Sequence, residues 1–98
     1  MPEPYRSTPV FDETTLPAAL RAEHRTKAGV WGLICVIEGE LRLTCIDPPL
    51  DRVLTGPDSA VVNPEQPHFV TPLGPMKMRV DFYSEPPDHP SGSASPSR

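Results

Sequence analysis

The chain has 98 residues and a formal net charge of −4 at pH 7, and it contains 15 prolines, 6 glycines and 2 cysteines. This length leaves room for one small domain with a modest hydrophobic core, so we expect no second domain. The nine lysines and arginines are scattered singly along an acidic chain. Nothing therefore predicts a nucleic acid or an anionic membrane surface as a partner.

Targeting and membrane-spanning patterns are not seen in the sequence. The longest apolar stretch, residues 30–37, is much shorter than the roughly 20 residues of a membrane-spanning helix, and the first residues do not resemble a signal peptide. We therefore expect a cytoplasmic protein in which Cys35 and Cys45 are reduced thiols. Residues 84–98 contain four prolines, five serines and little to bury, so we expect a domain over residues 1–83 and a disordered tail after it.

The first element expected along the chain is a short helix over residues 17–24. Thr14 or Thr15 provides a side chain that can cap a helix, and Pro17 suits a first helical turn. The helix-forming sequence AALRAEH follows Pro17. The pattern predicts about two helical turns.

Residues 30–46 have the strongest local pattern in the chain. An apolar run at residues 33–37 is followed by the sequence EGE at residues 38–40, and residues 41–45 then alternate between apolar and polar types. This pattern predicts a β-hairpin with its turn at residues 38–40. The first strand is expected to be covered on both faces, and the second strand on one face.

Prolines interrupt the second half of the chain every few residues and exclude long helices there. After a turn at residues 47–49, we expect four short strands, at residues 52–54, 59–63, 67–71 and 76–83. In the last of these, apolar residues at 76, 78, 80 and 82 alternate with polar or amphipathic ones and are expected to be buried. Many short strands after one short helix predict an all-β domain, either a small antiparallel barrel or a sandwich.

Residues 56–70 resemble the second sequence motif of the cupins. In that motif a Pro-Gly-Asp turn precedes a strand, and a Pro-His pair begins the next strand. Here the sequence GPD at residues 56–58 takes the place of the first turn, and Pro67 and His68 form the pair. The resemblance implies a cupin-like antiparallel β-barrel, the fold also called a double-stranded β-helix or jelly roll.

The first cupin motif is only partly present. It contains a His-x-His pair followed by a glutamate, and this sequence has His24-x-Thr26 without the glutamate. The departure counts against a complete set of cupin metal ligands.

A more specific string covers most of the expected domain: Leu16-Pro17, His24-x-Thr26-Lys27-x-Gly29-x-Trp31-Gly32, Gly39-x-Leu41, Pro64-x-x-x-His68 and Phe82-Tyr83. This string resembles the small cupin-like domain that occurs alone or at the N-terminus of some tellurite-resistance proteins of the B type. The family is therefore associated with tellurite, and the resemblance implies no defined reaction for the domain.

The resemblance implies that His24 and His68 point into the same mouth of the barrel. Two neutral imidazoles suit a divalent transition metal such as Zn, Fe, Ni or Mn, and the alternative is a polar pocket without metal. Most catalytic metal sites have three protein ligands. The alternation in the last strand places Asp81 on the face opposite the core, so no third ligand is predicted. Lys27 is expected to bind an anion or, alternatively, to be an ordinary exposed lysine.

Other chemically distinctive residues have simpler expected roles. Trp31, Phe82 and Tyr83 are expected in the core. Cys35 is expected to be buried and inert, and Cys45 to be more accessible.

Three functions follow as alternatives. The first is a module that binds a small molecule or anion, such as a metalloid oxyanion, through His24, Lys27 and His68. The second is a metal-dependent cupin enzyme of the dioxygenase or isomerase type. The third is a structural module that forms a homodimer through exposed edge strands.

Overall fold

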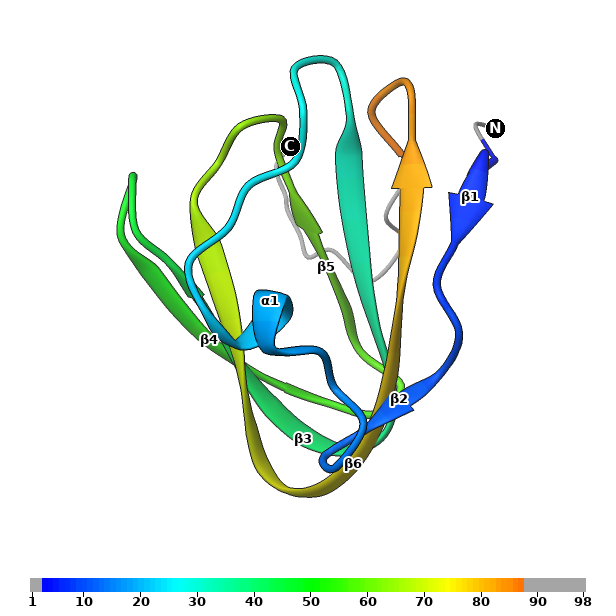
Figure 1. The fold of residues 1–98 in the computed structure, drawn as a ribbon, viewed down its shortest axis with the longest axis vertical. Coiled ribbons are helices and arrows are strands. Elements are labelled where there is room, and N and C mark those ends of the chain that lie inside the picture. The colour runs from blue at the N-terminus through cyan, green and yellow to red at the C-terminus, as the bar shows by residue number, and fades with distance from the viewer. Residues whose placement is uncertain (1–2, 88–98) are drawn as a thin grey trace.

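The computed structural model describes residues 3–87 and contains one antiparallel sheet with a single short helix (Figure 1). The elements in chain order are β1 (Arg6–Ser7), β2 (Phe11–Asp12), α1 (Ala18–Arg21), β3 (Trp31–Cys45), β4 (Leu50–Thr55), β5 (Ser59–Val62) and β6 (His68–Tyr83). The predicted all-β class with one short N-terminal helix is therefore confirmed. The predicted tail starts just after β6, and residues 88–98 of it lie outside the described residues.

Two long strands, β3 and β6, organise the sheet. They pair antiparallel from Trp31↔Tyr83 at one end to Cys45↔His68 at the other. The path through the sheet is β1-β6-β3-β4, with β2 also pairing with β6, and β5 with β3. Both long strands bend strongly in the middle, so the sheet folds over on itself and has a concave inner face (Figure 1).

The bend in β3 shows that the predicted hairpin at residues 38–40 is wrong. One continuous strand runs through these residues, and its register with β6 shifts twice around Gly39. Gly39 has a φ of 74°, and a Cβ atom on it would lie 2.1 Å from the carbonyl oxygen of Pro75. The glycine therefore permits a bulge and a close approach to β6, not a reversal of the chain. A glycine between two strand-forming segments is compatible with both arrangements, so the local pattern could not distinguish them.

The strands predicted at residues 67–71 and 76–83 are one strand, β6. Leu41 pairs with Pro72, and Gly39 pairs with Met76, so the segment between Pro72 and Met76 lies opposite the bend of β3. Proline is tolerated at this bend because the ladder of backbone hydrogen bonds is already interrupted there. The prolines therefore mark a bend and not the ends of strands.

The other two strands of the second half agree with the sequence. β4 contains the predicted strand at residues 52–54 and is longer at both ends, and β5 covers most of residues 59–63. A turn at residues 46–49 precedes β4, close to the predicted position. Both short strands are therefore confirmed. The sequence located them correctly because turn-forming residues lie at the ends of each.

The helix α1 is shorter than predicted and begins differently. It has four residues, Pro17 occupies its N-cap position, and no side chain caps it. The hydroxyls of Thr14 and Thr15 instead donate hydrogen bonds to Asp12 Oδ1, at 2.8 and 3.1 Å. The threonines thus stabilise the turn after β2. Within residues 3–87, no helix has the length and apolar character needed to cross a membrane.

The Asp12 carboxylate makes this turn sensitive to acid. Hydrogen bonds from the Thr14 hydroxyl and from the Thr14 and Thr15 amides lower the pKa of Asp12 from 3.8 to about 2. A carboxylate with a lowered pKa in the folded state stabilises the protein above about pH 4, and this contribution is lost as the pH falls toward about 2. We expect the melting temperature of Asp12→Asn to fall less than that of the wild type over this range. Equal falls, measured by circular dichroism, would contradict this role.

The hydrophobic core lies on the concave face of the sheet. Alternate residues of β3 and β6 point to this face, and those predicted at positions 76, 78 and 80 are buried. The buried core cluster consists of Leu16, Ile34, Val36, Leu41, Leu43, Cys45, Leu54, Ala60, Val62, Val70, Met76, Met78 and Val80, with Phe11, Leu20 and Phe82 packed against it. The core residues of β3, β5 and β6 also form the floor of the site described next.

Candidate functional site

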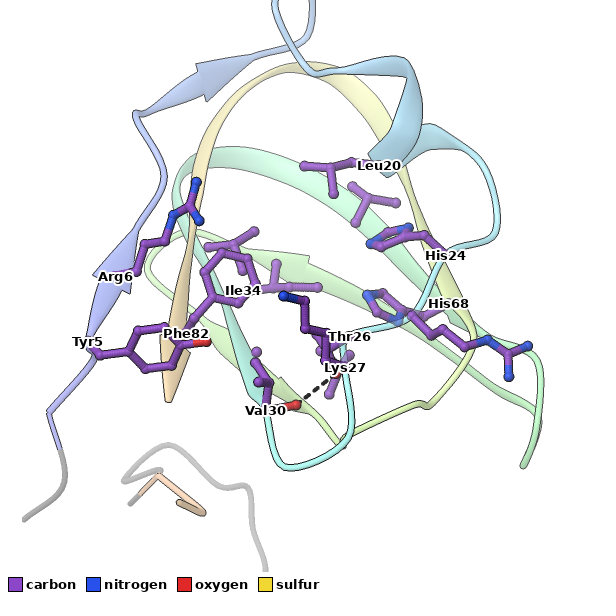
Figure 2. Close-up of a pocket in the computed structure, with 15 residues that line it drawn as sticks. Tyr5, Arg6, Leu20, His24, Thr26, Lys27, Val30, Ile34, His68 and Phe82 are labelled. Carbon is purple, nitrogen blue, oxygen red and sulfur yellow. Dashed lines mark hydrogen bonds between the residues drawn. The ribbon is translucent and has the colours of Figure 1, made fainter. Parts of the chain in front are cut away.

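A cavity of about 300 Å³ opens on the concave face, beside the loop that leads into β3 (Figure 2). It is lined by Tyr5, Arg6, Leu20, His24, Arg25, Thr26, Lys27, Val30, Gly32, Ile34, Val62, His68, Val70, Val80 and Phe82. The three residues singled out from the sequence, His24, Lys27 and His68, all line this cavity.

Backbone hydrogen bonds hold His24 and His68 together. The amide of each residue donates to the carbonyl of the other at 2.9 Å, which forms an isolated antiparallel bridge between the loop and β6. The two rings lie in contact, with centroids 4.1 Å apart and planes inclined at 56°. Two residues far apart in the chain therefore present their imidazoles at one place, as Figure 2 shows.

Backbone carbonyls also orient both imidazoles. His24 Nδ1 lies 3.0 Å from the Ala22 carbonyl oxygen, and His68 Nδ1 lies 2.7 Å from that of Gln66. A carbonyl can only accept, so each Nδ1 carries the proton, and in the neutral ring Nε2 is left as an acceptor. His68 is 3% exposed, and its burial, together with the nearby His24, lowers its pKa despite the hydrogen bond to Gln66. His68 is therefore neutral at pH 7.

The histidine pair by itself does not fit a three-ligand metal centre. Among residues 3–87, no group of three or more His, Cys, Asp and Glu side chains could hold a metal ion. Two imidazoles bound to one metal at about 2.1 Å have ring centroids about 5 Å apart, whereas His24 and His68 are 4.1 Å apart in ring contact. One ring would have to turn before both Nε2 atoms could bind the same ion.

The loop after His24 places Lys27 at the cavity. The Val30 amide donates to the Lys27 carbonyl at 3.1 Å, and Gly29 has a φ of 77°, as expected at the third position of a type II turn. The Thr26 hydroxyl donates to the Val30 carbonyl at 2.7 Å and braces the same turn (Figure 2). The Lys27 side chain extends from this turn toward the middle of the group of lining residues (Figure 2). The residues of the Thr-Lys-x-Gly motif thus form a turn that places the Lys27 side chain at the cavity.

The aromatic residues of the motif occupy different positions. Phe82 is half-buried, packs against the core and lines the cavity. Tyr83 is 8% exposed and is buried, as predicted, but it lies outside the core cluster. Trp31 is half-buried and also lies outside that cluster, so the prediction that it is a core residue is wrong. Because successive residues of a strand point to opposite faces, Trp31 faces away from the side to which Gly32 and Ile34 point.

Asp81 lies outside the cavity, as the sequence predicted, but it is itself buried. It is 4% exposed, and it accepts hydrogen bonds from Arg79 Nε and Nη2 at 3.0 and 3.2 Å. Cys35 Sγ lies 3.6 Å from Asp81 Oδ2. The carboxylate is thus paired within a polar cluster on the outer face of the sheet and is not a third ligand for the histidines.

Neither thiol is activated. Burial and the negative charge of Asp81 raise the pKa of Cys35 to about 11, and burial and Asp51 raise that of Cys45. Cys45 is 4% exposed and Cys35 is half-buried, so the expectations that Cys35 is buried and that Cys45 is the more accessible thiol are both wrong. Cys45 pairs with His68 on the central strand β6, and this pairing places the Cys45 side chain in the core.

The charged residues at the cavity are all basic. Arg6, Arg25 and Lys27 line it, and no aspartate or glutamate does. Arg25 forms an exposed ion pair with Glu23 at 3.5 Å, whereas Arg6 and Lys27 form no ion pair within residues 3–87. Arg6 was not predicted from the sequence, because it reaches the cavity only through its pairing with Phe82, which joins β1 to β6.

The two bent strands and a histidine-containing cavity on their concave face define a cupin-like domain, and solved structures agree. A protein from E. coli (strain K12) superposes with a TM-score of 0.78 and 23% identity over 88% of this chain and 93% of that one. A cupin superfamily protein from Desulfitobacterium hafniense DCB-2 superposes with a TM-score of 0.50 and 23% identity, over 61% of this chain and 52% of that one. These likenesses establish the predicted cupin-like fold.

The family is also established. The family model of the TehB-like domain matches residues 6–80, and the chain belongs to this family. TehB from Haemophilus influenzae superposes with a TM-score of 0.74 and 27% identity over 83% of this chain, which spans only 30% of that protein. No match is found among curated protein sequences. The chain is thus a cupin-like module related to tellurite resistance protein B.

Proposed function

We propose that this module binds a small anion in the cavity, through Lys27 and Arg6 together with the histidine pair. The observation that carries the proposal is the charge of the cavity wall: three basic residues and no acidic ones, in a chain with a net charge of −4. Cations that lack an acidic partner at a concave site attract an anion. A lysine ammonium binds it as a compact charge, and a guanidinium binds it through a planar pair of donors.

The histidines add a second requirement for the ligand. With each Nδ1 donating to a backbone carbonyl, Nε2 of a neutral His24 or His68 ring can only accept a hydrogen bond. A fully deprotonated anion has only acceptors and cannot satisfy these nitrogens. A ligand with both a negative oxygen and an O–H group satisfies the cations and the imidazoles together, and hydrogen tellurite is one such ion.

Calorimetric titration of tellurite into the wild type and variants tests the proposal. A hydrogen bond to a charged group contributes about 1.5–3 kcal/mol, so Lys27→Ala should weaken binding by about 10- to 100-fold. Lys77→Ala is the matched control, because Lys77 is an exposed lysine outside the cavity whose partner is Glu38, at 3.9 Å. Equal binding by the wild type, Lys27→Ala and His24→Gln would show that the anion does not bind in this cavity.

A metal-dependent enzyme of the dioxygenase or isomerase type is the competing function, with His24 and His68 as ligands. The same protein, purified without added metal, is therefore titrated with Zn²⁺, Ni²⁺, Fe²⁺ and Mn²⁺. Stoichiometric uptake that both His24→Gln and His68→Gln abolish would favour the enzyme. Such binding should weaken as the pH falls, because protons compete for the imidazole nitrogens.

A homodimer is supported by the edge strand β4. Its Leu50 and Val53 side chains are 50% and 48% exposed, and edge strands can pair with a second copy. The dimer does not compete with anion binding, since neither residue lines the cavity. Sedimentation analysis of the titrated samples measures the oligomeric state.

A further inference from the structure

We infer that the ligand of this cavity is an organic acid with a compact apolar body, of the size of a benzene ring, and not an inorganic oxyanion. The inference rests on the proposed function, because it assigns the chemical class of the anion at the same site. It rests on the apolar side chains that form the rest of the cavity wall.

The volume of the cavity exceeds what an inorganic oxyanion needs. A volume of about 300 Å³ is at the lower end of the range typical of small-molecule sites. It has room for about ten water-sized groups, whereas an ion such as tellurite has one central atom and three oxygens. A carboxylate with a six-membered ring has nine heavy atoms and matches this space.

The floor of the cavity is apolar and rigid. Ile34, Val62 and Val70 are 1–2% exposed and belong to the core, so their side chains cannot turn away from the ligand. Phe82 and Val80 complete this apolar wall from β6. A hydrated inorganic ion pressed against this wall would lose water without gaining hydrogen bonds. An apolar body gains affinity there, by about fourfold for each methylene group buried.

The polar groups lie where they can bind the acidic end of such a molecule. Arg6 on β1 and Lys27 on the loop are exposed cations. Figure 2 shows Phe82 and Ile34 between Arg6 on one side and His24 and His68 on the other, and Lys27 lies between Phe82 and His68 in this view. An arginine fork and an ammonium suit a carboxylate. The imidazole Nε2 atoms suit a hydroxyl group on the ligand. A hydroxy-substituted aromatic or branched aliphatic carboxylate combines all three features.

The test compares acetate, benzoate and 4-hydroxybenzoate with tellurite, each titrated into the full chain. We expect benzoate to bind at least tenfold more tightly than acetate, and 4-hydroxybenzoate to bind at least as tightly as benzoate. Phe82→Leu should reduce the ratio of benzoate to acetate affinity at least threefold. Phe69→Leu is the matched control, since Phe69 is a half-buried phenylalanine of the same strand that does not line the cavity.

The outcomes separate the two proposals. If tellurite or acetate binds and benzoate binds no more tightly, the inference about the apolar body is wrong, and the anion site stands. If no anion of the series binds, the proposed function itself is wrong. If Phe82→Leu does not fold, the ratio of benzoate to acetate affinity in the wild type tests the inference by itself.

Discussion

Gly39→Ala is expected to lower the free energy of unfolding by about 2–5 kcal/mol. Two effects add at this position. The φ of 74° lies in the left-handed region that alanine disfavours, and the new Cβ would lie 2.1 Å from Pro75 O and 2.8 Å from Met76 Cα. Both contacts are backbone atoms of β6, so no side chain can turn aside. The two long strands would have to separate at their bend.

Gly29→Ala is the matched control for this prediction. Gly29 has nearly the same φ, 77°, but no atom outside its chain neighbours lies within 4 Å of the position that an added Cβ would take. The substitution therefore adds only backbone strain, about 1–2 kcal/mol. Urea unfolding of the two variants measures the difference. If they are equally destabilised, the close contact between β3 and β6 at Gly39 is not what limits this position.

Ile34→Ala should have the second large effect, a loss of about 2–5 kcal/mol through the lost burial and the cavity left behind. Ile34 is 2% exposed, lies in the middle of β3 and is surrounded by the core of the concave face. A domain of this size has little stability to spare. The variant is therefore expected to be mostly unfolded at 37 °C, as measured by circular dichroism and urea titration.

Ile37→Ala provides the comparison in the same strand. Ile37 is 39% exposed and lies at the bulge, so its truncation should change the unfolding free energy by less than about 1 kcal/mol. Losses of similar size at both positions would contradict the assignment of the concave face as the core of the domain.

Membership of the TehB-like family constrains the function without defining it. The chain corresponds to 30% of TehB from Haemophilus influenzae, so the activity of that longer protein cannot be assigned to this module directly. The residues at the cavity, and not the fold, are therefore the basis for the anion proposal.

Local patterns in the sequence were sufficient for the fold class and for several elements. The alternation at residues 76–80 predicted that Met76, Met78 and Val80 are buried, because the two faces of a strand differ in exposure. It did not extend to the end of β6, where Phe82 is half-buried and Asp81 is buried on the other face. The turn-forming residues around β5 predicted its ends. The sequence string from His24 to Gly32 indicated the family. Residues of this string also have a local structural role, such as Gly29, whose positive φ permits the turn before β3.

The features that the sequence did not predict depend on contacts between residues far apart in the chain. A glycine at position 39 suits a hairpin as well as a bulge, and only the pairing of β3 with β6 along both halves decides between them. The same pairing places Cys45 in the core and carries β6 past Pro72. The contact between His24 and His68 depends on backbone hydrogen bonds between the loop and β6, and Arg6 reaches the cavity through its register with β6. Sequence periodicity reports the environment of one strand at a time, whereas the cavity is formed by residues that the pairing of distant strands brings together.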